Sequence, residues 1–234
     1  MSIARFGAVF DLNGVIINDG RLHDAAWLQV VNKGRAVKWT VADLHRIAGH
    51  STKSLVKSLC PEATSEAATL AIATEKDRVY EALLRHQLLV GPEELKIPGS
   101  CELIGELHAE SNSLALNTSS PANQVEMILG AFGLLPCFSV VLTQEDVQNP
   151  KPHPEGYLLA AQGLGLDPQE CAGFEDSLPG LNSLDLAKYR VIVAVGSLWP
   201  EEHIRASGLR IDRYIADFSG FTRNELSRLV AFHA

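Results

Sequence analysis

The residues of this chain with the clearest capacity for chemistry follow apolar runs of the sequence. They are Asp11, Thr118, Ser119, Lys151, Glu175 and Asp176. Carboxylate oxygens are the ligands that Mg²⁺ prefers, and a hydroxyl beside the backbone N–H groups of a helix start can hold phosphate oxygens. A lysine adds a compact positive charge that attracts anions. These residue types predict a site that binds a phosphate group together with a metal ion.

The spacing of these residues strengthens that prediction. Each of the sequence stretches that carry these residues has, by itself, an ordinary alternative as a turn, a helix cap, a loop or an exposed acidic cap. Roughly one strand–helix–strand length nevertheless separates Thr118 from Lys151, and Lys151 from Asp176. Four pieces in this order, each at a predicted strand end, are hard to obtain by chance.

Short apolar runs alternate with helical patterns along the chain. The runs that predict buried strands are "ARFGAVF" (4–10), "SLALN" (113–117), "FSVVLT" (138–143), "CAGFE" (171–175) and "RVIVAVG" (190–196). The helical patterns between them are "SPANQVEMILGAFG" (120–133), "PHPEGYLLAAQGLG" (152–165) and "DSLPGLNSLDLAKY" (176–189). This alternation predicts an α/β fold with a doubly wound, Rossmann-like parallel sheet, in which ligands bind at the carboxyl ends of the strands.

The distance between the first two predicted strands indicates an insertion. They lie about a hundred residues apart, whereas a strand–helix–strand step needs about 30. Residues 18–92 carry helical patterns and no convincing strand. We therefore expect a helical cap domain at 18–92, inserted into a core domain formed by 1–17 and 93–234.

Composition excludes several classes of partner. The 234 residues carry a formal charge of −8 with a pI near 5.5, which argues against nucleic acid or an anionic membrane as the main partner. The four cysteines are too widely spaced for a zinc or redox motif, and no run reaches the roughly 18 apolar residues of a membrane span. We expect a cytoplasmic monomer with reduced cysteines.

Four stretches of the chain resemble the motifs of the haloacid dehalogenase superfamily. Within it, the chain is most similar to the phosphatases and phosphomutases of the β-phosphoglucomutase type, which carry a helical cap. The stretches are "FDLNGVIIND" (10–19), "LALNTSSP" (114–121), "KPHPEGY" (151–157) and "FEDSLPGL" (174–181). The resemblance implies that Asp11 is a nucleophile that forms an aspartyl-phosphate. It also implies that Thr118 and Lys151 bind the transferring phosphoryl group, with Asn117 and Ser119 beside the substrate.

The same resemblance implies Mg²⁺ as the cofactor, held by Asp11, Asp176 and the backbone carbonyl of Asn13, with Glu175 supporting the ion. The family's phosphotransferases usually carry aspartate where this chain has Asn13, to protonate the leaving group and then to activate water. An amide keeps the backbone ligand but transfers no proton, and general acid–base catalysis contributes about 10² to 10⁴ in rate. We therefore expect intact binding and slow turnover.

Three explanations of Asn13 stay open. The amide fits a change engineered to trap a complex, a natural enzyme that turns over slowly, and a natural protein that only binds. Asp19, His23 or His50 could supply the missing proton, and each has an ordinary alternative at a helix end or on the surface.

Parts of the predicted cap resemble the segments with which the family's cap contacts its substrate. They make five residues candidates for substrate binding: His23, Gly49, His50, Ser51 and Lys76. The alternative for the two histidines and the lysine is a solvated helix face. Thr52 stands where the related phosphomutase has an arginine for its second phosphate group. This favours a phosphatase of a small, sugar-phosphate-like metabolite over a phosphomutase. A catalytically silent protein that binds phosphate and metal and, more weakly, a dehalogenase stay open as alternatives.

Overall fold

The computed structural model describes residues 6–47, 52–110 and 112–232 of the chain. The chain divides into two compact units, one formed by Met1–Asn18 and Pro92–Ala234 and the other by Asp19–Gly91. In the described residues, every strand belongs to the first unit, and the regular elements of the second are all helices.

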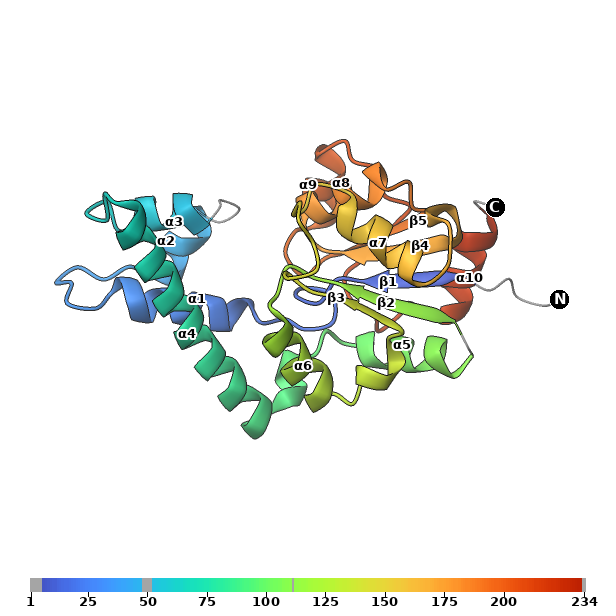
Figure 1. Ribbon diagram of the computed structural model, residues 1–234, viewed down its shortest axis with the longest axis horizontal. Coiled ribbons are helices and arrows are strands. Elements are labelled where there is room, and N and C mark those ends of the chain that lie inside the picture. Colours follow the sequence, from blue (N-terminus) through green and yellow to red (C-terminus); the bar gives the residue numbers. More distant parts are fainter. Residues whose placement is uncertain (1–5, 48–51, 111, 233–234) are drawn as a thin grey trace. The chain divides into compact units, whose positions relative to one another are not determined.

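The first unit is built on a six-stranded parallel sheet with the strand order β3-β2-β1-β4-β5-β6 (Figure 1). The strands are β1 (Gly7–Phe10), β2 (Ser113–Asn117), β3 (Val140–Leu142), β4 (Cys171–Glu175), β5 (Val191–Val195) and β6 (Arg213–Ile215). The predicted α/β fold with a Rossmann-like parallel sheet is confirmed, and the five predicted runs form β1 to β5. The last strand was not predicted, because it is only three residues long and begins with an exposed arginine.

The order of the strands determines where a ligand site can form. Sequence order along the sheet reverses between β1 and β4, and ligands of such sheets bind outside the strand ends at this reversal. Phe10 of β1 lies opposite Phe174 of β4 in the ladder. Asp11 and Glu175 follow these two phenylalanines in the sequence and therefore lie side by side at the carboxyl end of the sheet.

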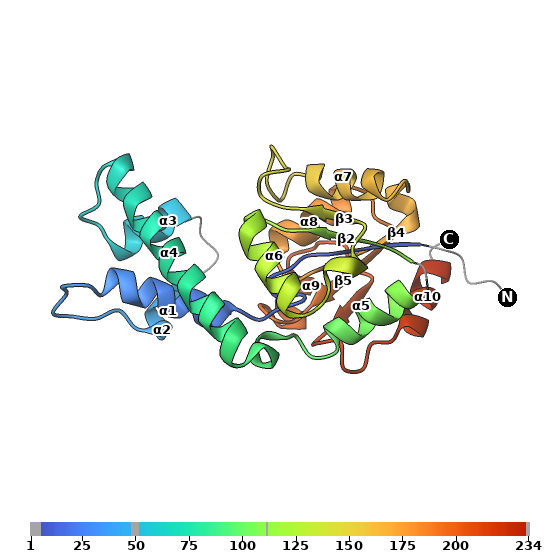
Figure 2. The same cartoon turned by 60° about the horizontal axis from the view of Figure 1, so that its bottom comes forward.

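Helices cover both faces of this sheet (Figures 1 and 2). One face carries α7 (Glu155–Gly163) and α8 (Leu178–Leu186), and the other carries α5 (Ser100–Ala109), α6 (Ala122–Ala131) and α10 (Arg223–Phe232). The shorter elements are α9 (Glu201–Ala206) and three 3₁₀ turns at Pro92–Leu95, Leu135–Cys137 and Pro168–Glu170. The three predicted helical patterns form α6, α7 and α8, whereas α5, α9 and α10 were not predicted.

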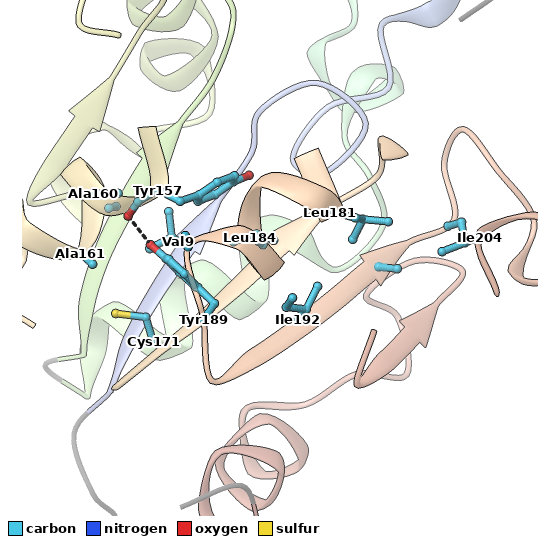
Figure 3. Packing of buried hydrophobic residues seen from close by; sticks show 13 residues of the cluster. Val9, Tyr157, Ala160, Ala161, Cys171, Leu181, Leu184, Tyr189, Ile192 and Ile204 are labelled. Carbon is cyan, nitrogen blue, oxygen red and sulfur yellow. Dashed lines mark hydrogen bonds between the residues drawn. The ribbon is translucent and has the colours of Figure 1, made fainter. Parts of the chain in front are cut away.

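An apolar core lies between the sheet and the layer of α7 and α8 (Figure 3). Val9 of β1 and Ile192 of β5 are fully buried there with Leu184 of α8. The Tyr189 hydroxyl donates to the backbone carbonyl of Tyr157 at 2.8 Å, which ties the end of the α8 segment to α7. This packing holds α7 and α8 against the sheet.

The second unit consists of α1 (Gly20–Val31), α2 (Val41–Arg46), α3 (Thr52–Leu59) and α4 (Glu66–Val90). Its helices α1 and α4 pack along each other, and a separate apolar cluster forms around Trp27, Leu44 and Leu59. The unit therefore has a core of its own. Among the described residues, no helix combines the length and apolar character that crossing a membrane requires.

Candidate active site

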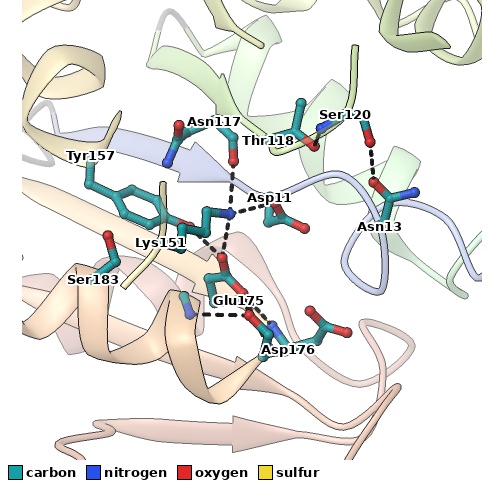
Figure 4. A network of polar contacts seen from close by, with 12 residues as sticks. Asp11, Asn13, Asn117, Thr118, Ser120, Lys151, Tyr157, Glu175, Asp176 and Ser183 are labelled. Atoms are coloured by element: carbon teal, nitrogen blue, oxygen red, sulfur yellow. Dashed lines mark hydrogen bonds and ion pairs between the residues drawn. The ribbon is translucent and has the colours of Figure 1, made fainter. Parts of the chain in front are cut away.

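Three carboxylates from two neighbouring strands meet at the carboxyl end of the sheet (Figure 4). Asp11 directly follows β1, Glu175 ends β4 and Asp176 comes next. A carboxylate oxygen of each lies within 4.8 Å of those of the other two. All three residues are buried, with Asp176 the most exposed at 9%. Because like charges at this distance repel, the cluster requires positive charge nearby.

Lys151 supplies one positive charge to this cluster. Its Nζ donates to Asp11 Oδ1 and Glu175 Oε1, each at 2.6 Å, and to the backbone carbonyl of Asn117 at 3.2 Å. Burial by itself would lower the pKa of Lys151, but the charges of Asp11 and Glu175 outweigh it and raise that pKa. The lysine therefore stays charged and connects the ends of β1, β2 and β4.

Glu175 accepts hydrogen bonds on both of its oxygens. The Tyr157 hydroxyl donates to Oε1 at 2.8 Å, and the backbone N–H groups of Asp176 and Ser177 donate to Oε2 at 3.1 and 3.2 Å. The Ser177 hydroxyl adds a further bond at 3.0 Å. With the lysine contact included, most of the acceptor capacity of Glu175 is used. Asp11 and Asp176 consequently keep more of their acceptor positions for an added cation than Glu175 does.

The charge balance of the cluster fits a divalent cation. Burial, partly offset by the charge of Lys151, raises the pKa of Asp11 to about 7. Burial, followed by the charges of Glu175 and Asp11, raises the pKa of Asp176 well above its usual value. A cation bound to these oxygens would offset the cost of burying the ionised carboxyls. The all-oxygen donor set suits a hard divalent ion.

Gly14 permits the close approach of the first and fourth motifs. Its φ is +77°, a left-handed conformation that side chains disfavour. A Cβ atom at this position would lie 1.9 Å from Asp176 Oδ2. Glycine is therefore required both by the backbone turn after Asn13 and by the carboxylate behind it.

Replacing Gly14 with alanine is expected to lower the free energy of unfolding by more than the roughly 1–2 kcal/mol of a left-handed alanine, because the new methyl group must also displace Asp176. Gly133→Ala is the matched control, since Gly133 has φ +68° and no atom within 4 Å of its added Cβ. Chemical denaturation of both variants measures the difference. Equal losses would show that Asp176 does not constrain this turn.

Asn13 lies against the loop that follows β2. The Ser120 hydroxyl donates to Asn13 Oδ1 at 2.7 Å, and the Ser120 backbone N–H donates to Thr118 Oγ1 at 3.1 Å. Thr118 is buried and Ser119 is exposed. These contacts bring the first two motifs together near Asp11 (Figure 4).

Three residues of the site were missed by the sequence reasoning. Ser120 adjoins the predicted pair in "TSSP", so its hydroxyl was a usable signal. Tyr157 lies in a predicted helical pattern and was not singled out, yet its hydroxyl binds Glu175. The Ser197 hydroxyl donates to Asp176 Oδ2 at 3.1 Å from the loop after β5, where no pattern marked it.

A pocket of about 340 Å³ adjoins the residues of the second and third motifs. Asn117, Thr118 and Gly156 contribute its buried lining, and Lys151 and Ser119 also line it. The predicted substrate-binding residues Asn117 and Ser119 thus share a cavity with Thr118 and Lys151.

Two predicted substrate-binding residues of the helical unit surround Tyr80. The His23 ring stacks on Tyr80 with 4.0 Å between centroids, and Lys76 Nζ lies 5.2 Å from the centre of the same ring. The Tyr80 hydroxyl donates to Asp19 Oδ2, and His23 Nε2 lies 3.3 Å from the same oxygen. Lys76 is buried rather than on a solvated helix face. Gly49, His50 and Ser51 lie outside the described residues.

The chain matches a family model of haloacid dehalogenase-like hydrolases over residues 7–187. It belongs to that hydrolase family, and the superfamily resemblance of its four motifs is confirmed.

The chain is also similar to individual proteins of known name and to solved structures. It is 29% identical to validoxylamine A 7'-phosphate phosphatase of Streptomyces hygroscopicus subsp. limoneus, over 74% of this chain and 78% of the relative. It is 30% identical to phosphoglycolate phosphatase of Salmonella typhi, over 81% of this chain and 80% of the relative. The structure of β-phosphoglucomutase from Clostridium difficile is similar in fold, with a TM-score of 0.77, 21% identity, and 98% and 99% of the two chains covered.

Proposed function

We propose that this protein is a Mg²⁺-dependent phosphatase that hydrolyses a small, sugar-phosphate-like metabolite through an aspartyl-phosphate on Asp11. The observation that carries the proposal is the buried cluster of Asp11, Glu175 and Asp176 with Lys151 bound 2.6 Å from Asp11. Membership of the hydrolase family and the phosphatase names of two relatives support it. We also assign the helical unit as the family's cap domain.

The proposed reaction has two displacements at phosphorus. In the first, a carboxylate oxygen of Asp11 attacks phosphorus, and the ester P–O bond breaks with its electron pair on the departing alcohol oxygen. In the second, water attacks the aspartyl-phosphate, the P–O bond to Asp11 breaks, and inorganic phosphate leaves. Lys151 and Thr118 bind the phosphoryl oxygens, whose charge is spread over three atoms in the transition state.

In this proposal Asp11, Asp176 and the backbone carbonyl of Asn13 would hold the metal, as the resemblance to the family implies, and Glu175 would support the site through its hydrogen bonds; the clustering of the three carboxylates supports this set. When bound, Mg²⁺ neutralises negative charge on the phosphoryl oxygens. Glu175 acts on Lys151 directly, because the 2.6 Å contact keeps the ammonium group beside Asp11. Tyr157 in turn holds Glu175 in place.

Asn13 limits the proposed turnover. An alkoxide leaving group needs a proton, and the attacking water must lose one. The Asn13 carboxamide can do neither, although its Oδ1 is held at 2.7 Å from the Ser120 hydroxyl. The binding steps depend on other residues and are retained.

The experiment that tests this proposal is phosphate release from a panel of sugar phosphates and one aryl phosphate. This protein and its Asn13→Asp variant are assayed with MgCl₂ and with EDTA. We expect release that requires Mg²⁺, faster in the variant. If neither protein releases phosphate from any ester, the proposal is wrong.

A second candidate function, a catalytically silent protein that binds phosphate and metal, is favoured by Asn13 alone. It predicts that Asn13→Asp gains no activity, while inorganic phosphate and Mg²⁺ still bind to both proteins. A genomic codon for aspartate at position 13 would remove the support for this candidate.

The dependence of stability on pH provides an independent prediction for the metal site. Burial raises the pKa of Asp11 from 3.8, the ordinary value that also applies to the unfolded chain, to about 7 in the folded protein without metal. The folded state therefore binds this proton more tightly than the unfolded state does. The stability that this group contributes is present below pH 3.8 and is lost as pH rises through about 7. Stabilisation by Mg²⁺ is therefore expected to increase with pH across this window.

The measurement is the melting temperature in EDTA and in MgCl₂ at several pH values within that window. Asp11→Asn is the control, because it removes one of the two carboxyls whose pKa is raised and should make the Mg²⁺ effect less dependent on pH. A Mg²⁺ effect that is the same at every pH, or that persists unchanged in Asp11→Asn, would contradict the assignment of Asp11 to the metal.

A further inference from the structure

Asp176 has fewer hydrogen-bond partners than the other two carboxylates of the cluster. Lys151 donates to both Asp11 and Glu175 at 2.6 Å. Among the residues that the structure describes, Ser197 is the only side chain that donates to the Asp176 carboxylate, with its hydroxyl 3.1 Å from Oδ2. The orientation of this carboxylate therefore depends on a single hydroxyl group.

Gly14 lies beside the same carboxylate oxygen. A Cβ atom at Gly14 would lie 1.9 Å from Asp176 Oδ2 and 2.8 Å from Ser197 Oγ. The bare backbone of Gly14 thus leaves room for the carboxylate and the hydroxyl together. Because the turn after β1 and the loop after β5 both contact Oδ2, the Asp176 carboxylate has little freedom to rotate.

Strand pairing brings Ser197 close to Asp176. Glu175, the last residue of β4, lies opposite Ala194 of β5 in the ladder. The backbone N–H of Gly196 donates to the carbonyl of Ile215 in β6 at 2.8 Å, which holds the chain on β6 just past the end of β5. Ser197 is the next residue, so it leaves the sheet at the same edge as the carboxylates.

Tyr214 of β6 holds the other end of the loop that carries Ser197. Its hydroxyl donates to the backbone carbonyl of Trp199 at 3.4 Å. A Cβ atom at Gly196 would lie 2.1 Å from the same hydroxyl oxygen, so the tyrosine packs directly against Gly196. Ser197 lies between these two contacts, and the fold therefore fixes the position of its hydroxyl.

A hydroxyl in this position is compatible with a metal ion on the same carboxylate. An ionised carboxylate has two oxygens with about four lone-pair sites, so one hydrogen bond leaves acceptor positions for a cation. Groups that hydrogen-bond to metal ligands orient those ligands, and replacing such a group typically costs about 10- to 100-fold in metal affinity.

We propose that Ser197 is a positioning residue of the metal site, whose hydroxyl holds the Asp176 carboxylate with one oxygen within 4.8 Å of those of the other two carboxylates. The proposal rests on the proposed function, which gives Asp176 to the metal. It deepens that function by adding a residue of the loop after β5, outside the residues 7–187 that the family model matches.

The test measures the Kd of Mg²⁺ alone for the complete protein without substrate. It is obtained from the rise of the melting temperature with MgCl₂ concentration, relative to the same protein in EDTA. Ser197→Ala is expected to raise this Kd by about 10- to 100-fold. A merely structural role for Ser197 predicts a lower melting temperature in EDTA and an unchanged Kd.

Ser207→Ala is the matched control within the connection between β5 and β6. The Ser207 hydroxyl donates to the backbone carbonyl of Ile204 rather than to a carboxylate, so the Kd of Mg²⁺ should not change. An unchanged or lower Kd in Ser197→Ala, or an equal rise in Ser207→Ala, would overturn the proposal.

Kinetics provide a second readout in the Asn13→Asp background. The MgCl₂ concentration that gives half-maximal phosphate release should rise in Asn13→Asp/Ser197→Ala by the same factor as the Kd, while kcat at saturating Mg²⁺ is retained. A lower kcat at saturating Mg²⁺ with an unchanged half-maximal concentration would contradict the assignment of Ser197.

These outcomes are separable from those of the proposed function, because Mg²⁺ binding is measured without turnover. Equal Mg²⁺ binding by this protein and Ser197→Ala contradicts only the role of Ser197. The expected change in Kd without phosphate release from any ester contradicts only the phosphatase proposal. If this protein binds no Mg²⁺, both proposals are wrong, since both require the metal site.

Discussion

Replacing Asn13 with aspartate is expected to raise the turnover of alkyl phosphate esters by about 10² to 10⁴-fold, the usual contribution of a general acid–base group. Aspartate has nearly the shape of asparagine, and its carboxylate can accept the Ser120 hydroxyl that Asn13 Oδ1 accepts at 2.7 Å. The backbone at this position is unchanged. The substitution should therefore restore proton transfer without moving the neighbouring motifs.

The gain should depend on the leaving group. An aryl phosphate releases a stable phenolate that hardly needs a proton, so this protein should still phosphorylate Asp11 but hydrolyse the aspartyl-phosphate slowly. Rapid-quench kinetics should show a burst followed by a slow steady rate with the aryl ester, and no burst with a sugar phosphate. Asp11→Asn, which lacks the nucleophile, should show no burst with either ester.

Two results would contradict this account of Asn13. Equal slowing on both esters without a phosphoenzyme would show that Asn13 impairs the site as a whole or that another residue transfers the protons. Unchanged turnover of alkyl esters in Asn13→Asp would exclude Asn13 as the limiting residue.

Replacing Lys151 with methionine is expected to lower the free energy of unfolding by about 3–5 kcal/mol, as for a buried ion pair that loses one partner. The lysine contacts Asp11 and Glu175 at 2.6 Å each, and its side chain is only 14% exposed. Its loss removes the cation that pairs with Asp11 and Glu175. Phosphate release should also become undetectable, because the proposed phosphoryl site loses the positive side chain that lies 2.6 Å from Asp11.

Denaturant unfolding in EDTA measures this loss of stability. Lys96→Met is the matched control, because Lys96 pairs at 2.8 Å with Glu93, whose side chain is 76% exposed, and such pairs contribute less than about 1 kcal/mol. Added Mg²⁺ should recover part of the stability of Lys151→Met and leave Lys96→Met unchanged. Similar losses in the two variants would show that Lys151 does not compensate the carboxylate cluster.

The chemistry of the site could be predicted from local features of the sequence. Asp11, Thr118, Lys151 and Asp176 each follow or lie near a strand that its apolar run marks. In a parallel sheet all strand ends of one polarity lie at the same edge. Residue type and strand order therefore led to the hypothesis of a phosphate and metal site, whereas the expectation that Asn13 replaces an acid–base aspartate came from the resemblance to the family.

The contacts within the site were decided only by the tertiary structure. Lys151 lies 140 residues from Asp11 in sequence and Ser120 lies 107 residues from Asn13, so no local pattern links them. Tyr157 has the spacing of an apolar helix residue, and only the packing of α7 on the strand ends directs its hydroxyl to Glu175.

The same distinction applies to charge and to hydrogen-bond satisfaction. The sequence by itself determined the fold class, the order of the four motifs and the residue types at each strand end, because these follow from hydrophobic periodicity and local chemistry. The tertiary structure alone decided that burial raises the pKa of Asp11 to about 7 and that the Asn117 amide lies against Gly156 without an acceptor. The physical reason is that desolvation and hydrogen bonding depend on which distant segments exclude water from a group, and that is settled only when the whole sheet and its helices have packed.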